Sequence, residues 1–178
     1  GGVDVLSLAE RYGTPLYVMD EERIRHNCRI YLDAMKKSFG ENALPLYASK
    51  ANSFKQIYKI VNEEGLGVDV VSAGEICTAV SAGFPMEKVY FHGNNKTDAD
   101  IEYAIKNGVG CFVADCIEEI DAIDSISKRF GVCSKVLIRI TPGIDPHTYD
   151  EVATGKVDSK FGSAIETGAA DEIMDLTL

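Results

Sequence analysis

Residues 44–52, LPLYASKAN, form a short buried strand in our interpretation, and this strand ends at a lysine. Leu46 and Tyr47 are apolar residues that suit a strand, and Pro45 lies near the strand start, where a missing N–H is tolerated. Lys50 follows among small residues that leave room for a bulky flat group. In α/β enzymes the functional site lies at the carboxyl ends of the strands. Lys50 is therefore a candidate site residue, unless it is a strand-end lysine that only reaches solvent.

The rest of the chain repeats this pattern of a short apolar strand followed by a helical segment. The strand candidates recur about every 22 residues and centre near Tyr47, Asp69, Tyr90, Phe112 and Leu137. The helical patterns between and after them cover residues 54–62, 73–82, 98–106 and 117–130, and a last one begins near Ala164. Such alternation predicts βα units, a parallel sheet and an α/β fold.

The number of units leaves two architectures open. A doubly wound sheet could be complete with five strands, whereas an eight-stranded barrel would need three more units. In the barrel interpretation the chain is part of a longer protein. Before the repeat, the sequence predicts a short helix over residues 3–11, a strand over residues 15–20 and a helix between Asp20 and Gly40.

Composition narrows the class of protein. The chain has 178 residues, 46% of them hydrophobic and 26% charged, which is typical of a globular domain. A net charge of −10 argues against nucleic acid or an anionic membrane as partner, and no apolar run is long enough to cross a bilayer. The five cysteines include no CxxC pair, which favours reduced thiols in a cytoplasmic protein.

The second strand carries an acidic residue where a buried strand should be apolar. Asp69 lies among valines, and a buried carboxylate is costly unless it is paired, so we expect Lys50 on the neighbouring strand to be its partner. The alternative is an alternating strand with Asp69 on a wet face. Ser72 and Glu75 have the spacing of a helix capping box, which explains both residues without a ligand.

The third strand ends at a histidine. His92 would face the same edge of the sheet as Lys50, although a single histidine is more often packed or hydrogen-bonded than a ligand. The turn after it is followed by Thr97 and Asp100, a second capping-box spacing. His26 falls on a predicted helix and is expected at the surface.

The fifth strand ends in the longest irregular stretch, residues 138–162. Arg139 is a cation in an apolar strand and needs an anion, for which Asp69 or a cofactor oxygen would serve. A long loop inside a compact domain is usually functional. The sequence contains no GxGxxG, P-loop, HExxH or GxSxG motif, so nucleotide binding, zinc and serine chemistry have no support.

Four segments together carry a family resemblance. PLYASKAN, GLGVDVVSAGE, FHGNNKT and TGKVDSKFG, in this order, resemble diaminopimelate decarboxylases, within the pyridoxal-phosphate decarboxylases built on an alanine-racemase-like barrel. The resemblance implies a partial pyridoxal-phosphate-binding (β/α)8 TIM-type barrel with about five of eight βα units. Residues 1–20 would belong with the β-domain of the full-length family, and residues 21–178 would form the truncated barrel.

The resemblance also implies roles for individual residues. Lys50 matches the lysine that bonds covalently to pyridoxal 5'-phosphate, and Asp69 matches the acidic residue beside that bond. His92 and Arg139 are expected to contact the cofactor, and Lys160 is similar to a lysine in a loop near a homodimer interface. Thr141 stands where many relatives have Asn.

The implied reaction is decarboxylation of meso-2,6-diaminopimelate to L-lysine, the last step of lysine biosynthesis. Family members are roughly twice as long, and the ring-stacking histidine, the glycine-rich phosphate loop and the substrate-binding residues have no match in this chain. We therefore expect the 178-residue chain alone to be an inactive fragment. The alternatives are another basic amino-acid decarboxylase or a racemase of the same barrel group, or a non-catalytic pyridoxal-phosphate-binding barrel.

Overall fold

A single parallel sheet organises the chain. The computed structural model describes residues 1–144, 147–149, 154–155 and 160–175. Five strands pair in the order in which they occur along the chain, and all four pairings are parallel. They are β1 (Leu46–Ala48), β2 (Gly67–Val70), β3 (Val89–Phe91), β4 (Cys111–Ala114) and β5 (Val136–Ile138).

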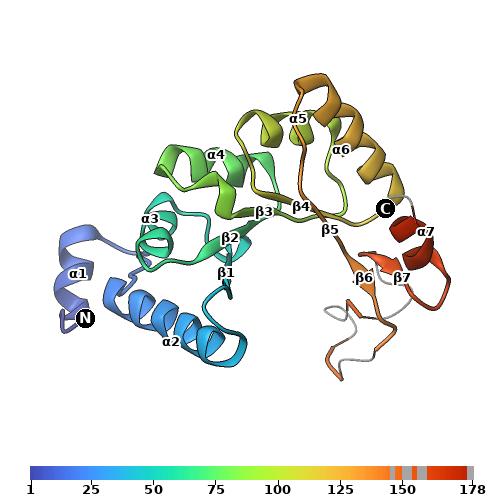
Figure 1. Cartoon of the computed structure of the whole chain (residues 1–178). Coiled ribbons are helices and arrows are strands. Elements are labelled where there is room, and N and C mark those ends of the chain that lie inside the picture. Colours follow the sequence, from blue (N-terminus) through green and yellow to red (C-terminus); the bar gives the residue numbers. More distant parts are fainter. Residues whose placement is uncertain (145–146, 150–153, 156–159, 176–178) are drawn as a thin grey trace.

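This strand order decides between the two predicted architectures. In a doubly wound sheet the strand order reverses at a switch point, whereas consecutive parallel strands that curve in one direction are a section of a barrel. Figure 1 shows that the sheet is curved, with a row of helices on its convex side. The barrel interpretation is confirmed, and the doubly wound alternative is wrong.

The helices between the strands lie where their sequence patterns predict. They are α3 (Lys55–Glu63), α4 (Ala73–Ala82), α5 (Asp98–Lys106) and α6 (Ile117–Phe130), with short 3₁₀ turns at η1 (Ser49–Ala51) and η2 (Met86–Lys88). Gly83 and Gly131 end α4 and α6 in the left-handed conformation, which glycine adopts without steric cost. The Thr97–Asp100 capping box at the start of α5 is confirmed.

The hydrophobic core lies between the sheet and these helices. In β2, Val68 and Val70 are fully buried under the helices, while Asp69 between them points to the other face of the sheet. Phe91 and Phe112 continue the core along β3 and β4, with ring centroids 6.1 Å apart. One face of the sheet is therefore apolar and closed by helices.

A short second sheet follows β5. β5 ends at Ile138, and after Arg139 the chain continues as β6 (Ile140–Thr141), which pairs in parallel with β7 (Ser163–Ala164). The sequence analysis did not predict β6 or β7. The predicted helix from Ala164 begins later, because residues 163–164 form the strand and α7 spans Ala169–Asp175.

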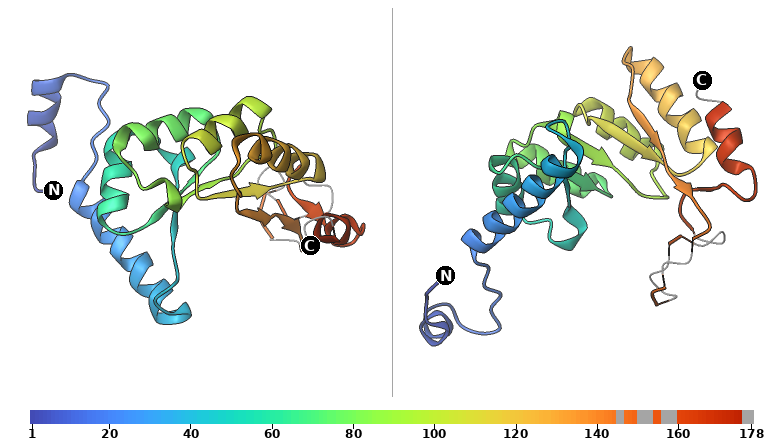
Figure 2. Two further views of the ribbon diagram at one scale, coloured as in Figure 1. Left: turned by 45° about the horizontal axis from the view of Figure 1, so that its top comes forward. Right: turned by 60° about the horizontal axis from the view of Figure 1, so that its bottom comes forward.

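The N-terminal part differs most from the prediction. The predicted helices are present as α1 (Val5–Tyr12) and α2 (Glu21–Phe39), with Asp20 and Gly40 as the caps of α2. The predicted strand over residues 15–20 is wrong: this segment is irregular and finds no strand partner in the described part of the chain. Tyr17 is 99% exposed, and both views in Figure 2 show α1 standing away from the sheet.

Candidate active site

The inner face of the curved sheet carries the candidate site. A cavity of about 1060 Å³ lies over the carboxyl ends of the strands, and its lining includes all four residues singled out from the sequence: Lys50, Asp69, His92 and Arg139. The inner face of the sheet is the concave side in Figure 1, opposite the helices. The structure therefore brings the predicted residues together: Asp69 lies in β2, and the other three follow β1, β3 and β5.

Lys50 is held at the cavity by the turn that follows β1. It lies in η1, two residues beyond Ala48, which is in register with Asp69 of β2. The buried hydroxyl of Ser49 lies 2.8 Å from the Asp69 carbonyl and 2.9 Å from Glu75 Oε1, so its single proton is shared between these two acceptors. The backbone under Lys50 is thus fixed to β2, while its own side chain stays exposed and free to react.

Glu75 supports this turn rather than completing a capping box. Ser72 caps α4 by accepting from the Glu75 N–H at 3.3 Å, as predicted. The Glu75 carboxylate instead turns inward and accepts from the Val71 N–H at 2.7 Å and from Ser49. From the first turn of α4, the Glu75 carboxylate thus links the turn after β1 to the residue that follows β2.

Asp69 has no hydrogen-bond partner for Oδ1, which is buried. The expected ion pair with Lys50 is not found among the described residues, since the Lys50 ammonium lies beyond ion-pair distance of the Asp69 carboxylate. Burial, together with the nearby Glu75 carboxylate, raises the pKa of Asp69 to about 6, although Lys50 and Arg139 act against this. An unpaired buried carboxyl facing a cavity is a site that a ligand donor can satisfy.

His92 is a titratable neighbour of Asp69. Its Nε2 lies 3.9 Å from Asp69 Oδ1, too far for a hydrogen bond. Burial and the positive charges of Arg139 and Lys96 lower the pKa of His92, so the imidazole is neutral at neutral pH. A neutral ring beside a cavity can stack or hydrogen-bond without adding charge.

Arg139 lies near Asp115 and not near the expected anion, Asp69. Neither Asp69 oxygen lies within ion-pair distance of its guanidinium; instead Arg139 Nε lies 3.8 Å from Asp115 Oδ1, at the end of β4. Asp115 was missed in the sequence, although it follows the buried strand Cys111–Ala114 just as Asp69 interrupts β2. The guanidinium also stacks over the Phe161 ring at 4.3 Å, which places Phe161 in the cavity wall.

Lys160 lies beside this wall but does not line the cavity. Its carbonyl accepts from Asn94 Nδ2 at 3.2 Å, and its ammonium lies 5.0 Å from the Phe161 ring centre. These contacts join the segment after residue 159 to the loop after β3. In the irregular stretch that contains Lys160, residues 145–146, 150–153 and 156–159 lie outside the described residues.

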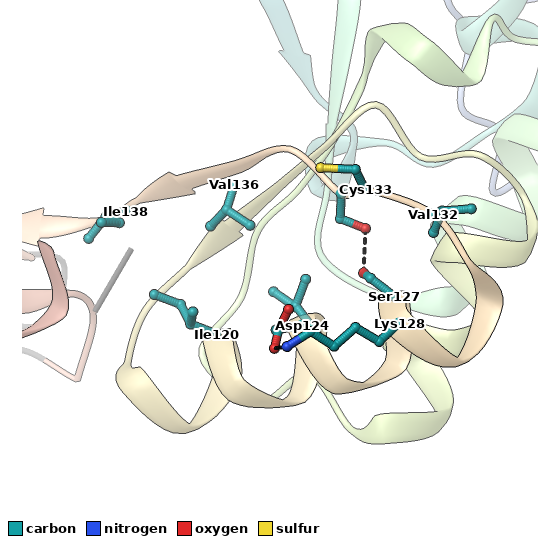
Figure 3. Close-up of a pocket in the computed structure, with 10 residues that line it drawn as sticks. Ile120, Asp124, Ser127, Lys128, Val132, Cys133, Val136 and Ile138 are labelled. Carbon is teal, nitrogen blue, oxygen red and sulfur yellow. Dashed lines mark hydrogen bonds and ion pairs between the residues drawn. The ribbon is translucent and has the colours of Figure 1, made fainter. Parts of the chain in front are cut away.

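A second cavity, of about 660 Å³, lies on the outer side between α6 and β5 (Figure 3). Its polar groups are already paired: Lys128 binds Asp124 at 2.6 Å, and Ser127 and Ser134 share a 2.8 Å hydrogen bond. The remaining lining is mostly aliphatic, from residues such as Ile120 and Val136. We therefore assign the candidate active site to the inner cavity.

The inner cavity fits an aldehyde-bearing aromatic cofactor. It offers one exposed amine, Lys50, an unpaired carboxyl, Asp69, and a neutral imidazole, His92, around a space large enough for a flat ring. No cluster of three or more histidine, cysteine or acidic side chains that could hold a metal ion occurs in the described part of the chain. The same part contains no helix with the length and apolarity needed to cross a membrane.

Comparison with known proteins identifies similar domains. Residues 23–177 match the family model for pyridoxal-dependent decarboxylases, pyridoxal binding domain. A diaminopimelate decarboxylase of Bacillus methanolicus is 46% identical over 178 residues, and one of Bacillus subtilis is 45% identical over the same length. The crystal structure of a diaminopimelate decarboxylase from M. jannaschii in complex with L-lysine is similar, with a TM-score of 0.86 and 35% identity.

These matches cover this chain far more completely than they cover the relatives. The chain aligns over its whole length with the two Bacillus proteins, but spans 41% and 40% of their lengths. In the M. jannaschii structure it covers 98% of its own length and 41% of the other chain. The similarity therefore concerns the domain that carries the inner cavity.

Proposed function

The chain belongs to the pyridoxal-dependent decarboxylases through their pyridoxal-binding domain, and we propose that its protein decarboxylates meso-2,6-diaminopimelate to L-lysine. The observation that carries this proposal is the 45–46% identity, over the full 178 residues, with proteins of that activity. The inner cavity supports it, because the amine, the carboxyl, the imidazole and the guanidinium that the chemistry needs line one space.

Lys50 is the residue we assign to covalent cofactor attachment. When bound there, pyridoxal phosphate supplies an electron sink that stabilises negative charge left by the departing carboxylate. The Lys50 amine can bond to the cofactor aldehyde because its side chain is exposed at the cavity while its backbone is fixed through Ser49. Small neighbours, Ala48 and Ala51, leave space beside it for the ring.

Asp69 is the group we assign to proton control beside Lys50. Its unpaired Oδ1 can accept a hydrogen bond from a protonated nitrogen at the cavity, and this would stabilise the positive charge there. With a pKa of about 6, Asp69 is ionised above that pH and can perform this role near neutral pH. His92, neutral and adjacent, packs the same corner without competing for the proton.

Arg139 and Lys160 are assigned to positioning and assembly. Arg139 presents its guanidinium to the cavity from the end of β5, where it can bind an oxygen of the cofactor. We propose that Lys160 lies near the interface of a homodimer, since its segment packs against the loop after β3 at the open side of the cavity. A second subunit there would shield the site from water.

The remaining assignments concern the rest of the protein. We propose that residues 1–20 pack against a separate β-domain, because α1 has exposed apolar residues and stands away from the sheet in Figure 2. All five cysteines are free thiols, which favours a reducing compartment such as the cytoplasm. The net charge of −10 argues against a nucleic-acid partner.

The test is carbon dioxide release by the protein as its gene encodes it, loaded with pyridoxal phosphate. We expect turnover with meso-2,6-diaminopimelate and none with L-ornithine. Borohydride reduction followed by peptide mapping should place the cofactor on Lys50. Turnover of ornithine instead would assign the protein to another basic amino-acid decarboxylase, and labelling of a different lysine would overturn the site.

A further inference from the structure

We propose that Lys96 is a positioning residue for the cofactor site: it neutralises Glu119, and this leaves Arg139 free to pair with Asp115. The inference deepens the proposed function, on which it rests for its ligand. Three of these residues lie outside the set found from the sequence. They connect the end of β3 with α6, β4 and β5.

The Lys96 ammonium is buried and fully bonded. Its side chain is 1% exposed and donates to the Gly93 carbonyl at 2.7 Å, to the Val113 carbonyl at 2.8 Å and to Glu119 Oε1. Three donors on a lysine ammonium thus meet three acceptors. A charge so completely enclosed is costly to bury unless it is paired and hydrogen-bonded, as it is here.

Glu119 is the anion that this charge compensates. Its side chain is 6% exposed at the start of α6, and its second oxygen accepts from the Asp115 N–H at 3.2 Å. Burial and the neighbouring Asp115 carboxylate raise the pKa of Glu119, whereas Lys96 lowers it. Glu119 and Asp115 therefore form a pair of adjacent carboxylates that repel each other.

Asp115 is where this network reaches the cavity wall. Its side chain is 6% exposed; Oδ1 accepts from the Gly162 N–H at 3.0 Å and lies 3.8 Å from Arg139 Nε, while Oδ2 is buried without a partner. Two buried carboxylates here face two cations. Because Lys96 pairs with Glu119, the Arg139 guanidinium remains available to Asp115 and to the cavity.

Removing Lys96 should therefore disturb Arg139 through charge. Two carboxylates would then compete for one guanidinium, which would draw Arg139 away from its position over Phe161 and the cavity. If Lys96 served only to fasten the loop at Gly93 to β4, the loss would instead come from the two broken carbonyl bonds. These two roles give opposite results when Glu119 is neutralised as well.

The experiment compares K96M, E119Q and the double variant K96M/E119Q in the protein as its gene encodes it. Affinity for pyridoxal phosphate is measured by absorbance titration, and thermal unfolding is followed in parallel. We expect K96M to bind the cofactor roughly tenfold more weakly, within the range seen when an outer hydrogen-bond partner is lost. The double variant, whose charges balance, should bind within about twofold of the unmodified protein.

The exposed pair Lys106–Glu102 supplies the matched control, since it has the same residue types at 2.5 Å on the surface of α5. K106M and K106M/E102Q should leave cofactor affinity unchanged. A double variant K96M/E119Q as weak as K96M, or a K96M protein with unaltered affinity, would overturn the proposal. Where K96M fails to fold, the double variant alone decides, since tight binding supports the proposal and weak binding contradicts it.

Failure of the proposed function gives a different signal. If the unmodified protein binds no pyridoxal phosphate, the function is wrong, and the inference is then read from crystal structures of the unmodified protein and the double variant. An Arg139–Asp115 pair retained in both supports the charge-balance role. An Arg139 displaced in the double variant contradicts it.

Discussion

The side chains on the two faces of the sheet lie in opposite surroundings. On the outer face, Val68, Phe91 and Phe112 lie under helices and are at most 1% exposed. On the inner face, Asp69 has an unpaired oxygen and Leu137 is 51% exposed. Alternation along each strand separates the two sets, because successive side chains point to opposite faces.

The difference shows how stability and chemistry are divided in this domain. The outer face buries apolar area and contributes most of the hydrophobic free energy of folding. The inner face keeps charged groups partly desolvated, which costs stability but raises the pKa of Asp69 and leaves Lys50 accessible. A substitution on one face should therefore affect a property that a substitution on the other leaves intact.

The largest expected effect is that of K50A on the inner face. Losing the amine that bonds to the cofactor should reduce kcat by at least about 1,000-fold, the order of loss seen when a covalent catalytic group is removed. Thermal stability without cofactor should change by less than about 0.5 kcal/mol, because the Lys50 side chain is exposed.

The matched control for K50A is K59A, an exposed lysine of α3 that does not line the cavity. Its turnover and stability should both equal those of the unmodified protein. A K50A protein that keeps its activity would remove the inner cavity as the active site. A K50A protein that unfolds would show that the two faces are not independent.

The next effect concerns stability and belongs to the outer face. Ile101 of α5 is fully buried in the core, so I101A should reduce the free energy of unfolding by about 2–5 kcal/mol. L137A, on the inner face of β5, removes an exposed side chain and should cost less than about 1 kcal/mol. Denaturant titration of both variants measures the contrast, and equal losses would contradict the division between faces.

A smaller effect comes from the pKa of Asp69. A carboxyl whose pKa is higher in the folded than in the unfolded protein favours folding at low pH, and this contribution is lost as pH rises from about 4 to about 6. The D69N variant cannot lose stability by this ionisation. At pH 7 and without cofactor it should therefore be more stable than the unmodified protein by on the order of 1 kcal/mol. Unfolding curves at several pH values test this.

D33N provides the control for D69N, because Asp33 is an exposed residue of α2. Its stability should follow the same pH dependence as that of the unmodified protein. If D69N and the unmodified protein lose stability in parallel between pH 4 and 6, the burial of Asp69 does not set its titration.

The outer face is the part of the molecule that sequence predicts well. Repeated short apolar strands and helical periods place β1–β5 and α3–α6 to within a residue or two, because the buried apolar side chains between sheet and helices leave a strong local pattern. The strand over residues 15–20 fails for a non-local reason. Its short apolar run suits a strand, but a strand needs a neighbour, and the described chain supplies none.

The inner face could be predicted only in part. Lys50, Asp69, His92 and Arg139 stand out as polar residues at strand ends, and they line one cavity. Their ion pairs could not be predicted from the sequence. Arg139 lies within ion-pair distance of Asp115 and not of Asp69, because the curvature of the sheet determines which strand ends meet. β6 and β7 were missed because two-residue strands carry no periodic signal.

The smallest effect tests the loop where the two faces meet, between β3 and α5. Thr97 caps α5 by accepting from the Asp100 N–H at 3.2 Å, so T97A should lower the free energy of unfolding by about 0.5–1 kcal/mol. T97S keeps the hydroxyl and should restore most of that loss. Cofactor affinity should stay unchanged in both variants, because the cap stabilises the outer helix, whereas the Lys96 hydrogen bond to the Val113 carbonyl fastens the loop to β4. Weaker cofactor binding by T97A would show that the helix cap also holds the inner cavity in shape.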